Sequence, residues 1–197
     1  MQEVSRVRST VRNPALQEPY GKERIHKKKL NPWYVSGFID GEGSFSVGIG
    51  VHKTLKRGIE IRCQFEIELR ADDRDILDRI CVTLGCGKIY DCSYERYGWY
   101  PHLKYKIGST KEMAKYLFPF LDRYPLQAKK RESYILFKKA VFLFLKKEHL
   151  SQKGYKKVLA LRKEIQIQGK KHLMETARVR ENRLPSGVWL NKENIRP

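Results

Sequence analysis

The segment Trp33–Phe45, WYVSGFIDGEGSF, constrains the fold of this chain more than any other part of the sequence. A short apolar run ends in two acidic residues, Asp40 and Glu42, each of which is followed by glycine. Asn31 is a good N-cap and Pro32 suits the first helical position, so the run predicts a buried helix that begins there. Alternating residues follow and predict a strand. The predicted helix therefore presents a carboxylate at its last turn, where the chain enters a strand.

A carboxylate on a rigid helix end suits a hard divalent cation held against a phosphate group. Gly37 and Gly41 lie four residues apart, on one face of the predicted helix. Because this face lacks side chains there, a second helix could approach closely, which predicts an interface between two such helices. The alternative is a simple helix–strand corner, in which the acids are solvated and the glycines only serve the turn.

The charge of the chain indicates its partner. Lysine and arginine number 41 and aspartate and glutamate 22, which gives a net charge of +19. So many positive charges repel one another in a compact monomer unless a polyanion binds them, so nucleic acid is the predicted partner. The alternative is a basic protein that is merely soluble. A membrane is not expected, because no basic amphipathic helix stands apart and the apolar run Ile135–Leu145 is too short to span a bilayer.

The length suits one domain with tails. We expect a domain over residues 30–168, a basic N-terminal extension over residues 1–29 and a basic C-terminal tail over residues 169–197. Both ends are expected to be mobile without nucleic acid, or to act as arms that track phosphates.

The cysteines and the N-terminal residues bear on the compartment. Cys63, Cys81, Cys86 and Cys92 form no Cys-x-x-Cys pair, and no histidine lies at zinc-finger spacing, so we expect reduced and mostly buried thiols. Residues 1–29 hold no apolar signal-peptide centre. The protein is therefore expected inside the cell, in the cytoplasm of a prokaryote or in an organelle (chloroplast or mitochondrion), and not secreted.

Two segments after the helix alternate strictly between apolar and polar residues. Ser44–His52 and Ile59–Arg70 predict a half-buried hairpin with its tip over residues 53–58. The polar face of the second strand mixes arginine, glutamine and glutamate, which suit guanine, adenine and the cytosine amino group in the major groove. Three glutamates on this face also suit the alternative, an ordinary solvated sheet face.

The rest of the chain predicts one more helix, a second hairpin and C-terminal helices. The helix begins at Asp72 or Asp73 and ends at Gly85. The hairpin consists of Lys88–Ser93 and Trp99–Ile107. Three helices are then expected, from Ser109 to about Phe118, from near Pro125 onward, and over Ser151–Gln166 with an end near Gly169.

Residues with donor or acceptor side chains on the predicted sheet face, its hairpin tip and nearby turns are candidates for DNA contact. These candidates are Ser44, Ser46, His52, Lys53, Lys56, Arg57, Arg62, Gln64, Glu66, Arg70, Lys88, Tyr90, Tyr100, His102, Lys104, Lys106 and Lys129. The stripe formed by Tyr100, His102, Lys104 and Lys106 is both basic and aromatic, which favours a role on nucleic acid.

The segment Val35–Gly43, VSGFIDGEG, resembles the nine-residue LAGLIDADG motif of homing endonucleases, and Ser44-Phe45 matches its usual continuation. The resemblance extends through FEIELRADDRDILDRI, LGCGKIY, PFLDRYPLQAKK and HLSQKGYKKVLALRKEI, roughly from Asn31 to Ile167. It implies an α+β fold of the type αββαββα, with a four-stranded antiparallel DNA-binding sheet and C-terminal helices.

The resemblance also implies an activity. It implies sequence-specific double-strand cleavage of DNA by metal-dependent phosphodiester hydrolysis, with Mg²⁺ as the favoured ion and Mn²⁺ as an alternative. Because the chain holds one motif, the active form is expected to be a homodimer on a long, roughly palindromic site. The dimer interface would include Trp33, Gly37 and Gly41.

By the same resemblance, Glu42 occupies the position of the metal-binding acid, where many members have Asp, and the Gly41 carbonyl would also face the metal. Lys130, with Lys129 beside it, matches a basic residue that the family keeps near the site, although a lysine there is otherwise a plain phosphate contact. The expected catalytic residues are Glu42, Lys130 and Asp40.

One position departs from the family pattern. The family often places Gln or Asn near the end of the second strand to order the attacking water, where this chain has Leu69. Either Glu68, Gln64 or Arg70 takes that role, or the chain lacks it. Two other functions therefore stay open: an RNA maturase that helps intron RNA fold, and a nucleic-acid-binding protein without chemistry, such as a ribosomal component. The intact Gly41-Glu42-Gly43 favours the endonuclease over the latter.

Overall fold

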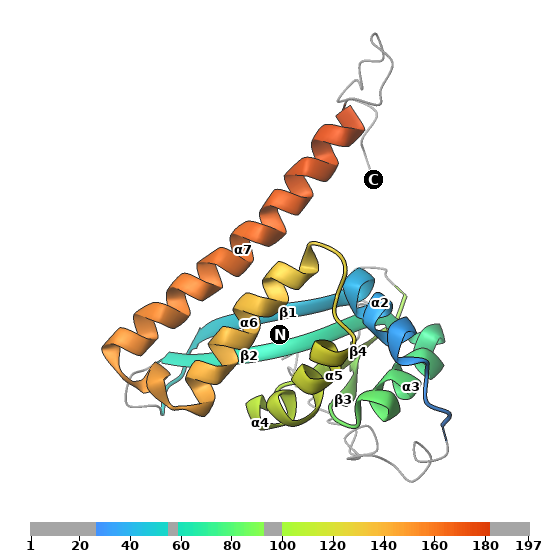
Figure 1. Cartoon of the computed structure of the whole chain (residues 1–197), viewed down its shortest axis with the longest axis horizontal. Helices are drawn as coiled ribbons and strands as arrows, with labels where there is room; N and C mark the ends of the chain where they lie inside the picture. The colour runs from blue at the N-terminus through green and yellow to red at the C-terminus, as the bar shows by residue number, and fades with distance from the viewer. Residues whose placement is uncertain (1–26, 55–58, 93–99, 182–197) are drawn as a thin grey trace, which may run out of the picture. The chain divides into compact units, whose positions relative to one another are not determined.

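The computed structural model describes residues 27–54, 59–92 and 100–181. The first elements are α2 (Pro32–Glu42), β1 (Gly43–Val51), β2 (Ile59–Arg70), the 3₁₀ turn η2 (Ala71–Asp73), α3 (Arg74–Leu84), β3 (Lys88–Cys92) and β4 (His102–Ile107), as Figure 1 shows. There follow α4 (Thr110–Glu112), the π-helical turn η4 (Met113–Leu117), α5 (Phe118–Arg123), α6 (Lys130–Leu145), η5 (Glu148–Leu150) and α7 (Gln152–Glu181). The chain divides into two compact units, residues 1–131 and 132–197.

The first unit is built on a four-stranded antiparallel sheet in the order β1-β2-β4-β3. Alternation along the strands buries one face of this sheet, while α2 contacts β1 and β2, and α3 contacts β2, β3 and β4. The strand residues with buried apolar side chains are Phe45, Val47, Cys63, Phe65, Ile67, Ile89, Leu103, Tyr105 and Ile107. The predicted α+β fold with a four-stranded antiparallel sheet is therefore confirmed.

The corner between α2 and β1 forms as the sequence predicts. The Asn31 side chain accepts a hydrogen bond of 2.9 Å from the Trp33 N–H and caps the helix. At the other end, a Cβ on buried Gly43 would lie 2.7 Å from the Ile39 carbonyl oxygen and 3.2 Å from the Phe65 ring. Only glycine therefore fits where the strand leaves the helix, and this close approach fixes the position of Glu42.

Helix α3 ends at Gly85, whose φ of 76° is left-handed, as predicted. Its start is different: η2 comes first, and Asp73 holds the N-cap position without a side-chain hydrogen bond. Asp72 instead accepts hydrogen bonds of 2.7 and 3.2 Å from the Arg70 guanidinium. Asp73 thus occupies the predicted N-cap position, while Asp72, the other candidate, pairs with Arg70 of β2.

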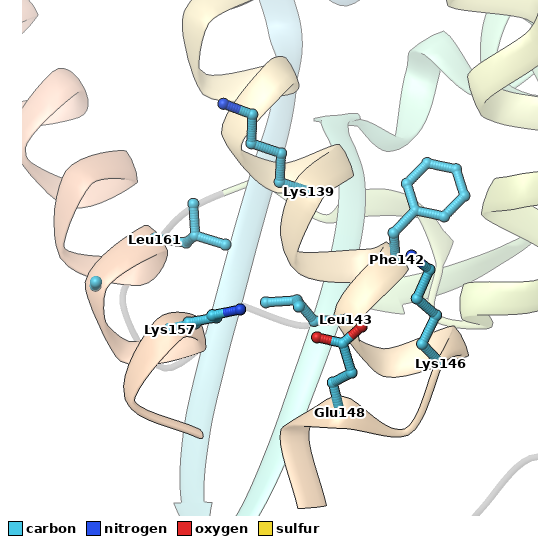
Figure 2. Close-up of a pocket in the computed structure, with 8 residues that line it drawn as sticks. Lys139, Phe142, Leu143, Lys146, Glu148, Lys157 and Leu161 are labelled. Atoms are coloured by element: carbon cyan, nitrogen blue, oxygen red, sulfur yellow. The ribbon is translucent and has the colours of Figure 1, made fainter. Parts of the chain in front are cut away.

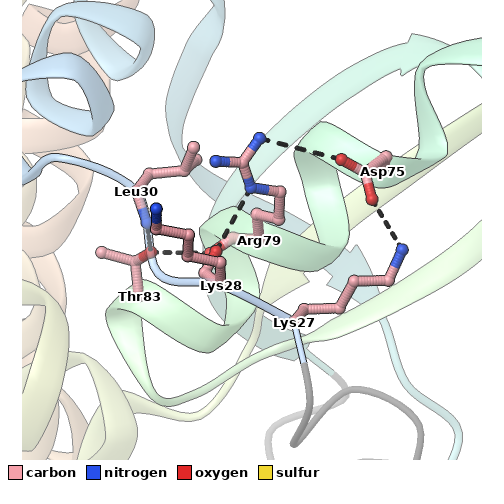
Figure 3. A network of polar contacts seen from close by, with 6 residues as sticks. All are labelled: Lys27, Lys28, Leu30, Asp75, Arg79 and Thr83. Atoms are coloured by element: carbon pink, nitrogen blue, oxygen red, sulfur yellow. Dashed lines mark hydrogen bonds and ion pairs between the residues drawn. The ribbon is translucent and has the colours of Figure 1, made fainter.

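Residues 27–30 lie along α3 (Figure 3). The Leu30 N–H donates to Thr83 Oγ1 at 2.9 Å, and Arg79 Nε donates to the Lys28 carbonyl at 3.2 Å. Lys27 forms an ion pair of 2.6 Å with Asp75. The end of the predicted N-terminal extension is thus bound to α3, and the remainder of it lies outside the described residues.

We expected the helix that Ser109 caps to end before Pro119, but it continues past that residue. Ser109 Oγ accepts from the Glu112 N–H at 3.3 Å, and the chain then runs through α4, η4 and α5 without a break. Pro119 lies at the second residue of α5, directly after the π-helical turn. A proline in the first turn of a helix costs little stability. The hydrogen bond that its missing N–H cannot make lies where the wide π-helical turn already changes the hydrogen-bond pattern.

Two further helix boundaries also differ from prediction. Helix α6 begins at Lys130 and not near Pro125, because the intervening loop binds α2, as described below. Helix α7 continues past Gly169 to Glu181, since a glycine inside a helix costs only about 1 kcal/mol. The predicted end of this helix near Gly169 is therefore wrong.

The second unit contains a surface pocket that the sequence did not predict. It is lined by apolar side chains of α6 and α7 together with three lysines and one glutamate (Figure 2). The lining residues are Lys139, Phe142, Leu143, Lys146, Glu148, Lys157, Ala160 and Leu161.

The cysteines agree with expectation. None of the four forms a disulfide, and Cys63, Cys81 and Cys86 are buried while Cys92 is half-buried. Burial raises the pKa of Cys63 and of Cys86 to about 12, so both remain protonated thiols. Within the described ranges, no helix is long and apolar enough to cross a membrane.

Candidate active site and nucleic-acid interface

The loop between α5 and α6 is bound to the last turns of α2. One carboxylate oxygen of Asp40 accepts hydrogen bonds from two backbone N–H groups, those of Gln127 at 2.6 Å and Ala128 at 2.9 Å. Buried Ser36 donates through its hydroxyl to the Tyr124 carbonyl at 2.7 Å. These contacts join residues almost ninety positions apart and set where α6 begins.

This loop places Lys130 against the C-terminal end of α2. Its ammonium group donates to the carbonyl oxygens of Gly41 at 2.7 Å and Ile39 at 3.3 Å. Burial lowers the pKa of Lys130, and the negative charges of Asp40 and Glu42 act in the opposite direction. The ammonium thus occupies the negative end of the helix dipole. The structure brings Asp40, Gly41, Glu42 and Lys130 together, with the Glu42 side chain exposed.

The donor atoms at this helix end suit a hard cation. The Gly41 carbonyl and the Glu42 carboxylate are oxygen ligands of the kind that Mg²⁺ prefers, and the carbonyl already bonds one cation, the Lys130 ammonium. Among the residues that the structure describes, no group of three or more His, Cys, Asp or Glu side chains could hold a metal by itself. Mg²⁺ fits such a sparse site because it keeps several waters and shares substrate phosphate oxygens.

Asp40 therefore carries a prediction about stability. Asp40→Ala leaves the Gln127 and Ala128 N–H groups without their acceptor, and we expect a loss of about 1–2 kcal/mol in the free energy of unfolding. Asp40→Asn keeps one oxygen acceptor and should lose less. Urea denaturation of both variants measures this, and equal stability of Asp40→Ala and the unmodified protein would show that these bonds do not hold the loop.

The face of the sheet opposite the core collects most of the predicted DNA-binding residues. Register and alternation place there Ser44, Ser46, Arg62, Gln64, Glu66, Arg70, Lys88, Tyr90, His102, Lys104 and Lys106. His52 and Lys53 follow the end of β1, Tyr100 precedes β4, and Lys129 directly precedes α6. Lys56 and Arg57 lie outside the described residues.

Acidic and basic side chains alternate across the centre of this face. Lys104 Nζ lies 3.1 Å from a Glu68 carboxylate oxygen and 3.6 Å from one of Glu66. Lys106 Nζ lies 3.3 Å from the other Glu66 oxygen. Burial lowers the pKa of Lys104, but the hydrogen bond to Glu68 and the two carboxylate charges outweigh it, so this pKa lies above its ordinary value. We call these four residues the lysine–glutamate cluster.

The cluster is flanked by two further pairs. Arg62 pairs with Glu60, and Arg70 pairs with Asp72 while its guanidinium lies 4.6 Å from the centre of the Tyr100 ring. Sequence reasoning identified the lysines and Glu66 as separate contacts and missed their pairing. The strict alternation on both strands was the available signal, but it does not give the register between β2 and β4.

One face of α2 is open. Trp33 is 54% exposed, and a Cβ built on Gly37 or on Gly41 meets no described atom within 4 Å. Trp33 packs edge-on against Tyr124, with ring centres 5.3 Å apart. The residues predicted to form a helix–helix interface therefore lie together on a surface that the described part of the chain does not cover.

Comparison with known proteins places these features in a family. The model of the LAGLIDADG endonuclease family matches residues 35–141. An uncharacterised protein encoded in an ND4 intron of Podospora anserina is 36% identical over 62% of this chain and 26% of its own length. The homing endonuclease I-ApeII of Aeropyrum pernix is 33% identical over 50% of this chain and 55% of its own length.

Solved structures agree in fold. The meganuclease I-SmaMI, bound to an uncleaved DNA target in the presence of calcium ions, matches with a TM-score of 0.64 and 35% identity over 70% of this chain. I-CpaMI bound to uncleaved DNA matches with a TM-score of 0.62 and 36% identity over 68%. This chain spans 45% and 43% of those two chains, less than half of each.

Proposed function

Because this chain belongs to the LAGLIDADG endonuclease family, we propose that it is a homing endonuclease, which hydrolyses both strands of DNA at a specific sequence. One observation carries the proposal. The Glu42 carboxylate and the Gly41 carbonyl lie at the exposed end of α2, with the Lys130 ammonium 2.7 Å from that carbonyl. Hard oxygen ligands beside a cation, in a chain of net charge +19, suit the hydrolysis of a phosphodiester.

The residues at this end of α2 would have different roles in the reaction. Glu42 and the Gly41 carbonyl would hold a divalent metal, Mg²⁺ or alternatively Mn²⁺, which when bound supplies an activated water and neutralises phosphate charge. I-SmaMI has been crystallised on DNA with calcium ions, which supports the use of a divalent cation here. Lys130 would stabilise negative charge on the scissile phosphate. Asp40 acts differently in this proposal, because its carboxylate holds the loop that positions Lys130.

The active form in this proposal is a homodimer. One chain supplies one Glu42, while cutting both strands needs a site for each strand. The surface of Trp33, Gly37 and Gly41 is open to a second helix. Two copies about a twofold axis would read a long, roughly palindromic site with their two sheets.

Residues 30–168 would form the endonuclease domain, with the basic ends as arms along the phosphate backbone. Relatives encoded in introns support an intron-encoded protein that acts inside the cell or an organelle.

The electrostatic part of this proposal has a direct test. DNA binding should weaken steeply with salt, because neutralising ~6 phosphates implies a loss of roughly a thousandfold in affinity between about 50 and 200 mM salt. Fluorescence anisotropy of a labelled duplex measures this dependence. An affinity that stays flat across the titration would remove nucleic acid as the partner. Tight binding of intron RNA without DNA cleavage would favour the maturase instead.

A further inference from the structure

The lysine–glutamate cluster makes the centre of the proposed DNA face electrically neutral. Its two lysines and two glutamates sum to zero in a chain whose net charge is +19. All four side chains are between 23% and 34% exposed, so they reach the surface while their charged groups are partly shielded from water. Glu66 and Glu68 stand directly opposite Lys106 and Lys104 on the paired strands β2 and β4.

This arrangement weakens indiscriminate binding. Phosphates attract any basic surface regardless of sequence, and that attraction supplies most of non-specific affinity. A lysine that already contacts a carboxylate gains less binding energy from a phosphate. The negatively charged carboxylate also repels the phosphate. Ion pairs that still reach solvent, as these half-buried ones do, contribute little to stability, so stabilising the sheet is a weak reason for two acids at this place.

The cluster also matches a particular pattern of base edges. In the major groove, a carboxylate accepts from the cytosine N4 amino group, and lysine donates to guanine O6 and N7. Alternating carboxylates and ammonium groups, side by side on neighbouring strands, therefore complement neighbouring G·C base pairs. At an A·T pair the adenine N6 amino group can still donate to a carboxylate, but no base edge there offers lysine the neighbouring O6 and N7 acceptors of guanine. The ion pairs within the cluster are then lost without full replacement.

We propose that Glu66 and Glu68 are specificity-determining residues, which disfavour arbitrary DNA and make the adjacent lysines available at neighbouring G·C base pairs. This inference rests on the proposed function in so far as DNA is the ligand, but it concerns binding and not cleavage. The two glutamates act by their charge and by their contact with Lys104 and Lys106.

The test compares Glu66→Gln with a matched charge change elsewhere on the sheet. Asp91 stands opposite Leu103, whose side chain is in the core, so Asp91 projects from the other face of the sheet. Asp91 is also exposed, so Asp91→Asn removes one negative charge without touching the cluster. Glu68→Gln is the second variant, and thermal melting by circular dichroism establishes that each protein is folded.

Affinity for a labelled mixed-sequence duplex is measured across a salt series. Glu66 contacts both lysines, so Glu66→Gln should bind this duplex roughly five- to tenfold more tightly at about 0.1 M salt, with a salt slope steeper by about one to two. Glu68→Gln should give the same change to a smaller extent, because it frees only Lys104 among the lysines of the cluster. Asp91→Asn should change affinity by less than about twofold.

Selection by binding from a randomised duplex library provides the second readout. The unmodified protein should enrich neighbouring G·C pairs at fixed positions, and Glu66→Gln should lose that preference. If both glutamine variants match Asp91→Asn in salt slope and in the sequences they select, the inference is wrong. Absence of cleavage in Mg²⁺ would overturn the proposed endonuclease and leave this comparison of binding unaffected.

Discussion

Glu42→Gln is expected to abolish metal-dependent strand cleavage and to leave DNA affinity within a few fold of the unmodified protein. The side chain lies exposed at the last residue of α2, so the change should not disturb packing. It removes the one acidic ligand that a single chain would offer at this site. Loss of even an outer-shell partner of a metal ligand costs ~10–100-fold, so loss of the ligand itself should cost at least about a hundredfold in the cleavage rate.

Single-turnover cleavage of the selected target duplex in Mg²⁺ measures the rate, and a binding titration without metal measures affinity. Glu164→Gln is the matched control, because Glu164 is an exposed glutamate on α7 and the charge change is the same. It should cleave at the unmodified rate. If Glu42→Gln also cleaves at that rate, Glu42 is not the metal ligand.

Gly37→Leu is expected to keep the fold of the chain and to prevent double-strand cleavage. A side chain at Gly37 meets no described atom within 4 Å, and leucine favours a helix over glycine by about 0.8 kcal/mol, so thermal stability of the monomer should not fall. In the proposed dimer the same side chain would keep the two α2 helices apart. Sedimentation on the target duplex should therefore show one Gly37→Leu chain per duplex, whereas the unmodified protein should show two.

Gly169→Leu makes the same substitution at a helical glycine of α7 that is also open, with no described atom within 4 Å of an added Cβ. It should leave both the dimer and cleavage intact. A Gly37→Leu protein that still sediments as a dimer on DNA and cuts both strands would show that this face of α2 is not the interface.

Alternation and helix-capping patterns in the sequence predicted the strands and helix ends that are determined by residues close together in the chain. Strict alternation gave β2 over Ile59–Arg70, and the Asn31 cap gave the start of α2. The continuation of helical structure through Pro119 and Gly169 could not be predicted from such local patterns. A π-helical turn accommodates the proline, and a helix as long as α7 tolerates the modest cost of one glycine.

The candidate site was predicted in part. The motif pointed to Glu42 and Gly41 and the wider family resemblance pointed to Lys130, and the structure brings the three together. The contact of Asp40 with two N–H groups of a loop almost ninety residues away follows from tertiary packing, which a local pattern does not contain. The lysine–glutamate cluster likewise depends on the register between β2 and β4 and on side-chain rotamers.

The central claim, a homodimeric endonuclease, is tested most directly by exposing a randomised duplex library to the purified protein in Mg²⁺ and sequencing the new ends, with a chelator-treated sample as background. The account predicts paired breaks on both strands inside one long and roughly palindromic sequence. New ends no more frequent than in the chelator-treated sample, or breaks confined to one strand, would contradict it.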